Sequence, residues 1–409
     1  MFDAKKNVLD NGIKLITIKK DTQMMSIHMG IKIGAIYEGK NEKGISHFIE
    51  HMLFKGTSSR NNEVLNKELE ALGGEYNAYT DNSSTVFSIT ALKDEVEKSI
   101  ELLSDMLKNS ILDEKEIEKE REVILAEIRS CKDDIEDFSF KKTNEAAFKD
   151  SPLRYDILGN ENTVKSFDKN ELKNFYEKYY VPNNSYIAIV SPFPHEYVID
   201  LVKKYFKEWI YKEFNRNTVL EECNIPINKI SYRKDIEQST IVYLFTFYGL
   251  DKKEELALKI LSYKLGESSN SILFRELREK RGFAYDIYTD LDLSAHVKTF
   301  YIYTSISKEN LDSAIEVIDE CINNIKERKI RFEKDTIDLM KKTLKTAIAF
   351  TLEDVTDLGN YALHQSIDGE DLFQFYKDIE DLNNMEKEDI YKIASKVLRN
   401  PTIHVLLNN

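Results

Sequence analysis

The sequence repeats itself at an offset near 210 residues. The segment Ala78-Tyr79-Thr80-Asp81 recurs as Ile287-Tyr288-Thr289-Asp290, and each copy is followed by an alternating apolar stretch that leads into an amphipathic helix. The strand that is predicted over residues 185–190 recurs over residues 402–407. This repeat indicates duplication of one α+β unit, so we expect two similar lobes that face each other across a cleft.

The length of the chain also suits two lobes. A chain of 409 residues exceeds the usual size of one domain, and two domains of about 200 residues are the default expectation. We predict a first lobe over residues 1–210 and a second over residues 229–409. The linker is predicted over residues 211–228, where Pro226 and mixed polar residues interrupt any period.

Periodicity predicts the elements of the first half. Ile27, Met29 and Ile31 alternate with small or polar residues, which is the period of a strand with one buried face, and the pattern returns over residues 85–91. Helices are expected over about residues 43–55, 62–72, 94–109, 113–130 and 168–180. We therefore predict an α+β fold in which each lobe is an antiparallel sheet with helices packed on one side.

Composition and charge exclude several classes of partner. A net charge of −14 argues against nucleic acid, because duplex binding depends on clusters of Lys and Arg. No apolar run approaches the roughly 20 residues of a membrane span, and the first residues lack the apolar region of a secretory signal. We therefore expect a cytoplasmic protein without a membrane partner. Cys131, Cys223 and Cys321 have no CxxC spacing, so a metal would need His and carboxylate ligands.

The segment His47-Phe48-Ile49-Glu50-His51 carries the chemistry. Two histidines at i and i+4 lie on one face of a helix and can reach one metal ion. Two imidazoles with a carboxylate ligand form a catalytic zinc set, and Glu50 beside them can take a proton from water. The alternative is a helix that carries two histidines by coincidence, but unpaired imidazoles on an apolar helix would be costly.

Candidates for a third ligand lie in the predicted helix over residues 113–130. Glu120 and Glu127 are seven residues apart and share a face with the apolar Ile117, Val123 and Ile124. Carboxylates on an apolar stripe need a partner, which could be a metal ion or a buried Lys or Arg. Periodicity does not decide between these two partners.

The motifs between Glu42 and Phe87 resemble those of a known family. They are the HxxEH segment, Phe54-Lys55-Gly56-Thr57, Gly73-Gly74 and Asn77-Ala78-Tyr79-Thr80. In these the chain resembles the pitrilysin-like inverzincins, zinc peptidases that include insulin-degrading enzyme and the mitochondrial processing peptidases. The resemblance implies that the third ligand is a Glu about 76 residues after the second His, a spacing that Glu127 meets. It also implies that Glu120 supports the site.

The resemblance extends to residues 273–285. From the residues alone, this segment is a charged, solvated helix end followed by a strand tyrosine. The resemblance implies that Arg278 and Tyr285 reach across the cleft to the substrate backbone and the oxyanion. At the repeat offset, Ala257, Ile260 and Leu261 stand where the first half has His47, Glu50 and His51, so only the first lobe can hold zinc.

The resemblance implies that Asn77, Ala78, Tyr79 and Thr80 form part of an edge strand to which an extended peptide adds. An ordinary strand after a Gly-Gly turn explains the same residues. The other histidines have no partner spacing and are interpreted as surface or core residues: His28, His195, His296, His364 and His404.

Together these features predict a zinc-dependent endopeptidase with one Zn²⁺ per chain, whose lobes enclose a peptide chamber. Its substrates would be extended oligopeptides or unfolded segments. His47, His51 and Glu127 would bind zinc, and the catalytic residues would be Glu50, Glu120, Arg278 and Tyr285. The resemblance to short, two-lobed family members implies a homodimer. A processing peptidase for one presequence and a non-catalytic peptide-binding subunit remain as alternatives.

Overall fold

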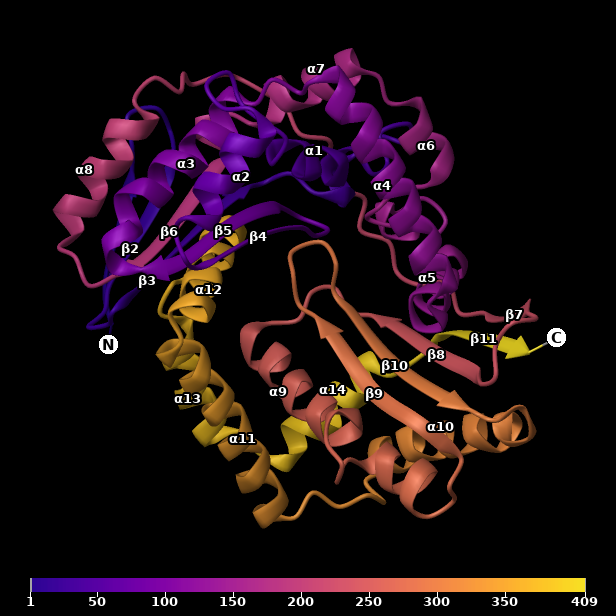
Figure 1. Ribbon diagram of the computed structural model, residues 1–409. Helices are drawn as coiled ribbons and strands as arrows, with labels where there is room; N and C mark the ends of the chain where they lie inside the picture. The colour runs from indigo at the N-terminus through magenta and orange to yellow at the C-terminus, as the bar shows by residue number, and fades with distance from the viewer. Residues whose placement is uncertain (1, 409) are drawn as a thin grey trace. The chain divides into compact units, whose positions relative to one another are not determined.

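The computed structural model describes residues 2–408, which form two compact units (Figure 1). Unit 1 comprises residues 2–129, 156–219 and 349–372, and unit 2 comprises residues 130–155, 220–348 and 373–408. Each half of the chain therefore contributes a segment to both units. The predicted lobe boundaries follow the sequence repeat, whereas the compact units follow tertiary contacts and exchange these two segments.

The two sheets share one strand order. The sheet of unit 1 runs β1-β2-β6-β3-β5-β4 and that of unit 2 runs β7-β11-β8-β10-β9, so five strands correspond one to one. All neighbours are antiparallel except β2 with β6 and β7 with β11. The strands are β1 (Asp3–Val8), β2 (Lys14–Lys19), β3 (Met24–Ile31), β4 (Glu75–Thr80), β5 (Thr85–Leu92), β6 (Ser185–Ser191), β7 (Asn228–Arg233), β8 (Ser239–Thr246), β9 (Ala284–Asp292), β10 (Thr299–Ile306) and β11 (Thr402–Asn408).

The helices follow the same duplication. Those of the first half are α1 (Ile45–Leu53), α2 (Asn62–Glu70), α3 (Val96–Asn109), α4 (Glu114–Asp133), α5 (Ile135–Ala147), α6 (Glu161–Ser166), α7 (Lys169–Tyr179) and α8 (His195–Phe206). Those of the second half are α9 (Lys252–Ser262), α10 (Leu311–Lys326), α11 (Lys334–Glu353), α12 (Val355–Asp368), α13 (Gln374–Asn384) and α14 (Lys387–Val397). Two π-helical segments, η5 (Tyr263–Glu267) and η6 (Phe274–Glu279), follow α9.

The sheet of unit 1 is covered by helices on both faces. Met25, Ile27 and Met29 of β3 are buried on the face that carries α3 and α8. Ser26 and His28 on the opposite face are also buried, at 0% and 3% exposure, because α12 packs against β3 and β6 there (Figure 1). The prediction of a strand with one buried face is therefore wrong for β3.

Unit 2 repeats this arrangement with a helix from the first half of the chain. There α5 packs against β8 and β11, the counterparts of β3 and β6, and Ser139 Oγ lies 2.6 Å from Thr240 Oγ1. The helices α5 and α12 correspond in chain order, and each begins at an Asp cap, Asp134 and Asp354. The halves thus exchange equivalent helices. The α+β class is confirmed, but helices cover both faces of each sheet instead of one.

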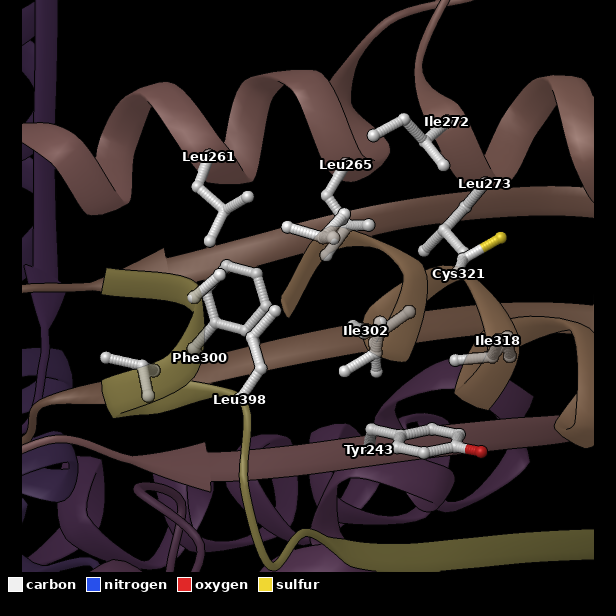
Figure 2. Packing of buried hydrophobic residues seen from close by; sticks show 14 of the residues in the cluster. Tyr243, Leu261, Leu265, Ile272, Leu273, Phe300, Ile302, Ile318, Cys321 and Leu398 are labelled. Carbon is white, nitrogen blue, oxygen red and sulfur yellow. The ribbon is translucent and has the colours of Figure 1, made fainter. Parts of the chain in front are cut away.

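The core of unit 2 lies between its sheet and the helices α9, α10 and α14. Phe300 and Ile302 of β10 point toward the helical layer, where they pack among Leu261 of α9, Leu265 of η5 and Ile318 of α10 (Figure 2). Burying each such side chain stabilises the fold by roughly 1.5–3 kcal/mol. Among residues 2–408, no helix combines the length and the apolar composition that crossing a membrane would require.

Candidate metal centre

The helix α1 is held at its beginning by a buried carboxylate. Glu38 accepts hydrogen bonds from the backbone N–H groups of Gly44 at 3.0 Å and Ser46 at 2.8 Å. Gly44 has φ of 93°, and a Cβ there would lie 2.5 Å from the carbonyl oxygen of Leu158, so this position requires glycine. These contacts fix where α1 begins and hence the direction in which its histidines point.

Sequence reasoning missed Glu38. Burial raises the pKa of its carboxyl to about 7, although the N–H groups of Ser46 and Gly44 and the charge of Lys43 oppose the shift. Glu38 precedes the first residue of α1 by seven positions, outside the spacing of a local capping box. The contact between the Glu38 carboxylate and the beginning of α1 depends on the turn between Glu38 and Gly44, so no local sequence signal marks Glu38.

The structure brings His47, His51 and Glu127 together in unit 1. The two imidazole rings have centroids 4.6 Å apart. Glu127 Oε2 lies 3.7 Å from Nε2 of each histidine. One potential ligand atom from each of the three residues lies within 4.8 Å of the other two, and within residues 2–408 this is the one such group of His, Cys, Asp or Glu side chains.

This donor set fits a zinc ion. Burial, and then the neighbouring His51, lower the pKa of His47 to about 3, so its ring is neutral as a metal ligand must be. The His47 Nδ1 atom is buried and has no hydrogen-bond partner among the described residues. No Lys or Arg is paired with Glu127 by a salt bridge within the described part of the chain. Two imidazole nitrogens and one carboxylate oxygen thus converge without a protein cation between them.

Glu120 supports His51 from the neighbouring helix α4. The Nδ1 atom of His51 donates to Glu120 Oε2 at 3.0 Å, and Lys55 Nζ lies 2.7 Å from Glu120 Oε1. Burial raises the pKa of Glu120, but the hydrogen bonds from His51 and Lys55 outweigh burial and hold the pKa below its ordinary value. A lysine therefore does pair with Glu120, although Lys55 is only partly buried, and His51 shares the same carboxylate.

The apolar stripe of α4 is narrower than predicted. Ile117 and Ile124 are buried, but Val123 is half-exposed at 49%. Glu127 is partly exposed, whereas Glu120 is buried at 6% exposure. The two carboxylates therefore share one side of α4 but differ in their access to solvent.

Glu50 lies one residue before His51 and has a hydrogen-bond partner on the edge strand β4. The hydroxyl of Thr80 donates to Glu50 Oε2 at 2.7 Å. Burial raises the pKa of Glu50, and the hydrogen bond from Thr80 opposes the shift. The Oε1 atom has no hydrogen-bond partner within residues 2–408. Glu50 is thus held at one oxygen, while the other can accept a proton.

The strand β4 leaves an open edge beside this helix, because it is the last strand of its sheet. The backbone N–H of Asp81 donates to the carbonyl of Ser84 at 2.9 Å. Antiparallel pairing alternates, so the N–H and C=O groups of Ala78 and Thr80 point away from β5. The Ala78 N–H meets only a local acceptor, Asn77 Oδ1 at 2.9 Å. An added strand could pair with this edge.

A cavity of about 310 Å³ opens between α1 and β4. Its walls combine aromatic rings with charged and amide side chains: Glu50, His51, Phe54, Lys55, Asn66, Tyr76, Asn77, Ala78 and Glu120. The predicted residues Asn77 and Ala78 therefore lie beside the predicted base and one predicted ligand. A peptide side chain could enter this space while its backbone lies on β4.

Arg278 and Tyr285 lie in unit 2. Arg278 belongs to the π-helical segment η6, and its Nη1 donates to the carbonyl of Tyr285 at 2.9 Å. The guanidinium lies 5.0 Å from the ring centroid of Phe274, and the Tyr285 side chain is 71% exposed at the start of β9. Both groups are available to a ligand, and their role at the oxyanion stays a prediction.

The remaining histidines have local partners. His28, His195 and His404 are buried, and each lies within 3.0 Å of a Ser or Thr hydroxyl. His296 pairs with Glu221 at 2.7 Å, and His364 contacts the hydroxyl of Tyr79. None belongs to the metal-ligand group found within residues 2–408.

Two models of protein families match this chain, and many known proteins are similar to it. The model of the insulinase family, peptidase family M16, matches residues 14–161, and that of the M16 inactive domain matches residues 166–344. An uncharacterized zinc protease of Rickettsia felis is 28% identical over 98% of this chain and 96% of its own length. The beta subunit of the mitochondrial-processing peptidase of Caenorhabditis elegans is 26% identical over 87% of this chain and 79% of its own length.

Solved structures agree on the fold. A protease from Helicobacter pylori superposes with a TM-score of 0.92 at 20% identity, with both chains covered completely. The inactive-domain model falls on the half that has Ala257, Ile260 and Leu261 at the positions of the motif. The two family models together span most of residues 14–344, and this chain belongs to peptidase family M16.

Proposed function

We propose that this chain is a zinc-dependent endopeptidase that cleaves extended peptides or unfolded segments. The observation that carries the proposal is the convergence of His47, His51 and Glu127, with Glu50 on the adjacent helical position. The names of the zinc-protease relatives support it. A non-catalytic binding subunit would be favoured by loss of a ligand, and all three ligand positions are filled.

Bound zinc would act as a Lewis acid toward water and the scissile carbonyl. Glu50 would take a proton from water at Oε1 while Thr80 holds Oε2, and would return it to the leaving amine. Glu120 would hold the ring of His51 in one orientation through Nδ1, which leaves Nε2 directed at the metal. Arg278 and Tyr285 would meet the negative charge that develops on the carbonyl oxygen.

The substrate would bind as an added strand along β4. The backbone groups of Ala78 and Thr80 that point away from β5 can pair with an extended peptide once the Ala78 N–H exchanges its local acceptor Asn77, and such main-chain hydrogen bonds do not depend on side-chain identity. This recognition suits oligopeptides and unfolded segments of varied sequence. A processing peptidase would use the same chemistry and would add side-chain selection in the adjoining cavity.

Metal removal and peptide mapping test the proposal. The protein is treated with a chelator, supplied again with stoichiometric Zn²⁺, and incubated with a mixed peptide library that is read by mass spectrometry. We expect cleavage to disappear without metal and to return with one zinc per chain. Cleavage that persists without zinc would contradict the proposed chemistry. Cleavage confined to one sequence would favour a processing peptidase.

We also propose that the protein works as a homodimer, because both the zinc ligands and the Arg278–Tyr285 segment occur on this one chain. Light scattering of the purified protein should give twice the mass of one chain. A monomer alone, or activity only with a different added subunit, would contradict this.

A further inference from the structure

The metal site gives Thr80 a partner in Glu50 but explains neither Tyr79 nor the recurrence of the Tyr-Thr-Asp segment. Tyr79 and Thr80 in β4 recur as Tyr288 and Thr289 in β9, although the second half lacks the zinc ligands. Both strands stand at the edge of their sheets, as β4 in one and β9 in the other. The shared residues therefore point to a role that both edge strands need.

In unit 1, Tyr79 ties β4 to the exchanged helix α12. Its hydroxyl donates to Asn360 Oδ1 at 2.7 Å and lies 2.7 Å from Nε2 of His364. A phenol has one hydrogen, so with Asn360 as its acceptor it receives the second hydrogen bond from His364. The rings of Tyr79 and His364 are stacked, with an interplanar angle of 18°. Tyr79 and Thr80 point to opposite faces, so β4 is held from both.

The helix α12, which holds Tyr79, packs closely against the sheet of unit 1. A Cβ on Gly359 of α12 would lie 2.6 Å from the ring of His28, and one on Gly30 of β3 would lie 2.8 Å from Ile367. The absence of side chains at both glycines lets helix and sheet approach closely. Lys32 Nζ donates to the carbonyl of Ile367 at 2.6 Å, at the end of the helix. Tyr79 is therefore attached to a fixed support.

Unit 2 builds the same attachment with different partners. The hydroxyl of Tyr288 donates to Glu136 of the exchanged helix α5, and the ring of Phe140 stacks on Tyr288 at an angle of 29°. Thr289 donates to the carbonyl of Ser262, where α9 ends, at 2.9 Å. In each unit the Tyr joins the edge strand to the exchanged helix. The Thr joins the edge strand to a helix on the opposite face of the sheet, α1 in unit 1 and α9 in unit 2.

We propose that Tyr79, held by Asn360 and His364, is a positioning residue that fixes the open edge of β4 for the substrate backbone. Through α12, the second half of the chain then controls substrate binding at a metal site in the first half. This inference rests on the proposed function, in which an extended peptide adds to β4. We call the contacts of Tyr79 with Asn360 and His364 the clamp. An edge strand that is held in place loses little conformational freedom when a peptide binds, so the clamp raises the affinity for the peptide.

Replacing Tyr79 by Phe tests the clamp, because Y79F keeps the ring and removes only the hydroxyl. We expect KM for a long peptide to rise about three- to tenfold, the effect of one hydrogen bond, with kcat within about twofold and zinc content unchanged. The matched control is Y176F, which removes a buried hydroxyl that donates to the carbonyl of Leu107 at 2.8 Å, away from β4. Y176F should leave KM unchanged.

Two further measurements separate the clamp from peptidase activity. Hydrogen exchange without substrate should be faster in Y79F than in wild type at the amides of Asn77 and Tyr79, which pair with β5. N360A alone should raise KM, and N360A added to Y79F should raise it no further, because the hydrogen bond is already lost. N360A also carries the test if Y79F does not fold.

An unchanged KM together with unchanged amide exchange in Y79F would overturn the inference, and so would additive effects of Y79F and N360A. If the wild-type protein cleaves no peptide, the proposed function fails, and amide exchange alone decides whether Tyr79 holds β4. Faster exchange in Y79F would then still support the clamp, and unchanged exchange would overturn it.

Discussion

The hydroxyl of Thr80 donates a 2.7 Å hydrogen bond to Glu50, and so links the edge strand β4 to the helix that carries the histidines. Replacing Thr80 by Val removes the donor and keeps the shape of the side chain. We expect T80V to lower kcat about tenfold, because the carboxylate of Glu50 loses the hydrogen bond that orients it. T80S keeps the donor and should retain most of the activity. Equal kcat values for T80V and wild type would show that Glu50 needs no such support.

Glu120 should affect metal affinity more than fold stability. Its carboxylate orients His51 through Nδ1, and loss of such a partner weakens metal binding about 10- to 100-fold. We expect E120Q to release zinc to a competing chelator at correspondingly lower chelator concentration. E122Q, on the exposed side of the same helix, is the control and should bind zinc as wild type does. Equal zinc affinity of E120Q and wild type would exclude the supporting role.

His28 should make the stability of unit 1 depend on pH. Burial, and then the charge of His364, lower its pKa to about 4. Between pH 4 and the ordinary value near 6.5, the unfolded chain binds a proton there and the folded chain does not. The stability that the neutral His28 provides is therefore fully present above pH 6.5 and is lost as the pH falls toward 4. The loss amounts to roughly 3 kcal/mol.

The variant H28Q isolates this effect, because it removes the titrating ring and keeps a polar group for the hydroxyl of Ser26, which lies 3.0 Å from His28 Nε2. Urea unfolding is measured for both proteins from pH 7.5 down to pH 4.5. The free energy of unfolding of wild type should decline more steeply than that of H28Q over this range. Parallel pH profiles of the two proteins would contradict the burial of a neutral imidazole against α12.

Much of the candidate site could be predicted because its signals are local. The i, i+4 spacing of His47 and His51 lies within one helix, and the helix α1 forms where the apolar period placed it. The link to Glu127 came from the resemblance, since periodicity left a metal and a buried cation equally open for the carboxylates of α4. The structure shows both kinds of neighbour, with Lys55 at Glu120 and the two imidazoles at Glu127.

The exchange of α5 and α12 could not be predicted from local pattern. An amphipathic period shows that a helix buries one face, but it does not say which sheet covers that face. The alternation with Ile27, Met29 and Ile31 predicts one buried face for β3, and it leaves His28 and Gly30 on the other face. They are buried because small residues let α12 approach closely and because His28 meets the hydroxyl of Ser26. Glu38 could not be predicted for a similar reason, because its hydrogen bonds to the start of α1 depend on the turn between Glu38 and Gly44.

The variant E50Q tests the central claim most directly, because it changes one carboxylate oxygen to an amide beside the metal ligands and leaves all three ligands in place. Zinc content by metal analysis and cleavage of a peptide by mass spectrometry are measured on the same preparation. We predict one zinc per chain in both E50Q and wild type, with cleavage lost by at least about 100-fold in E50Q. E50Q that binds zinc and still cleaves peptides at the wild-type rate would contradict the assignment of Glu50 as the base.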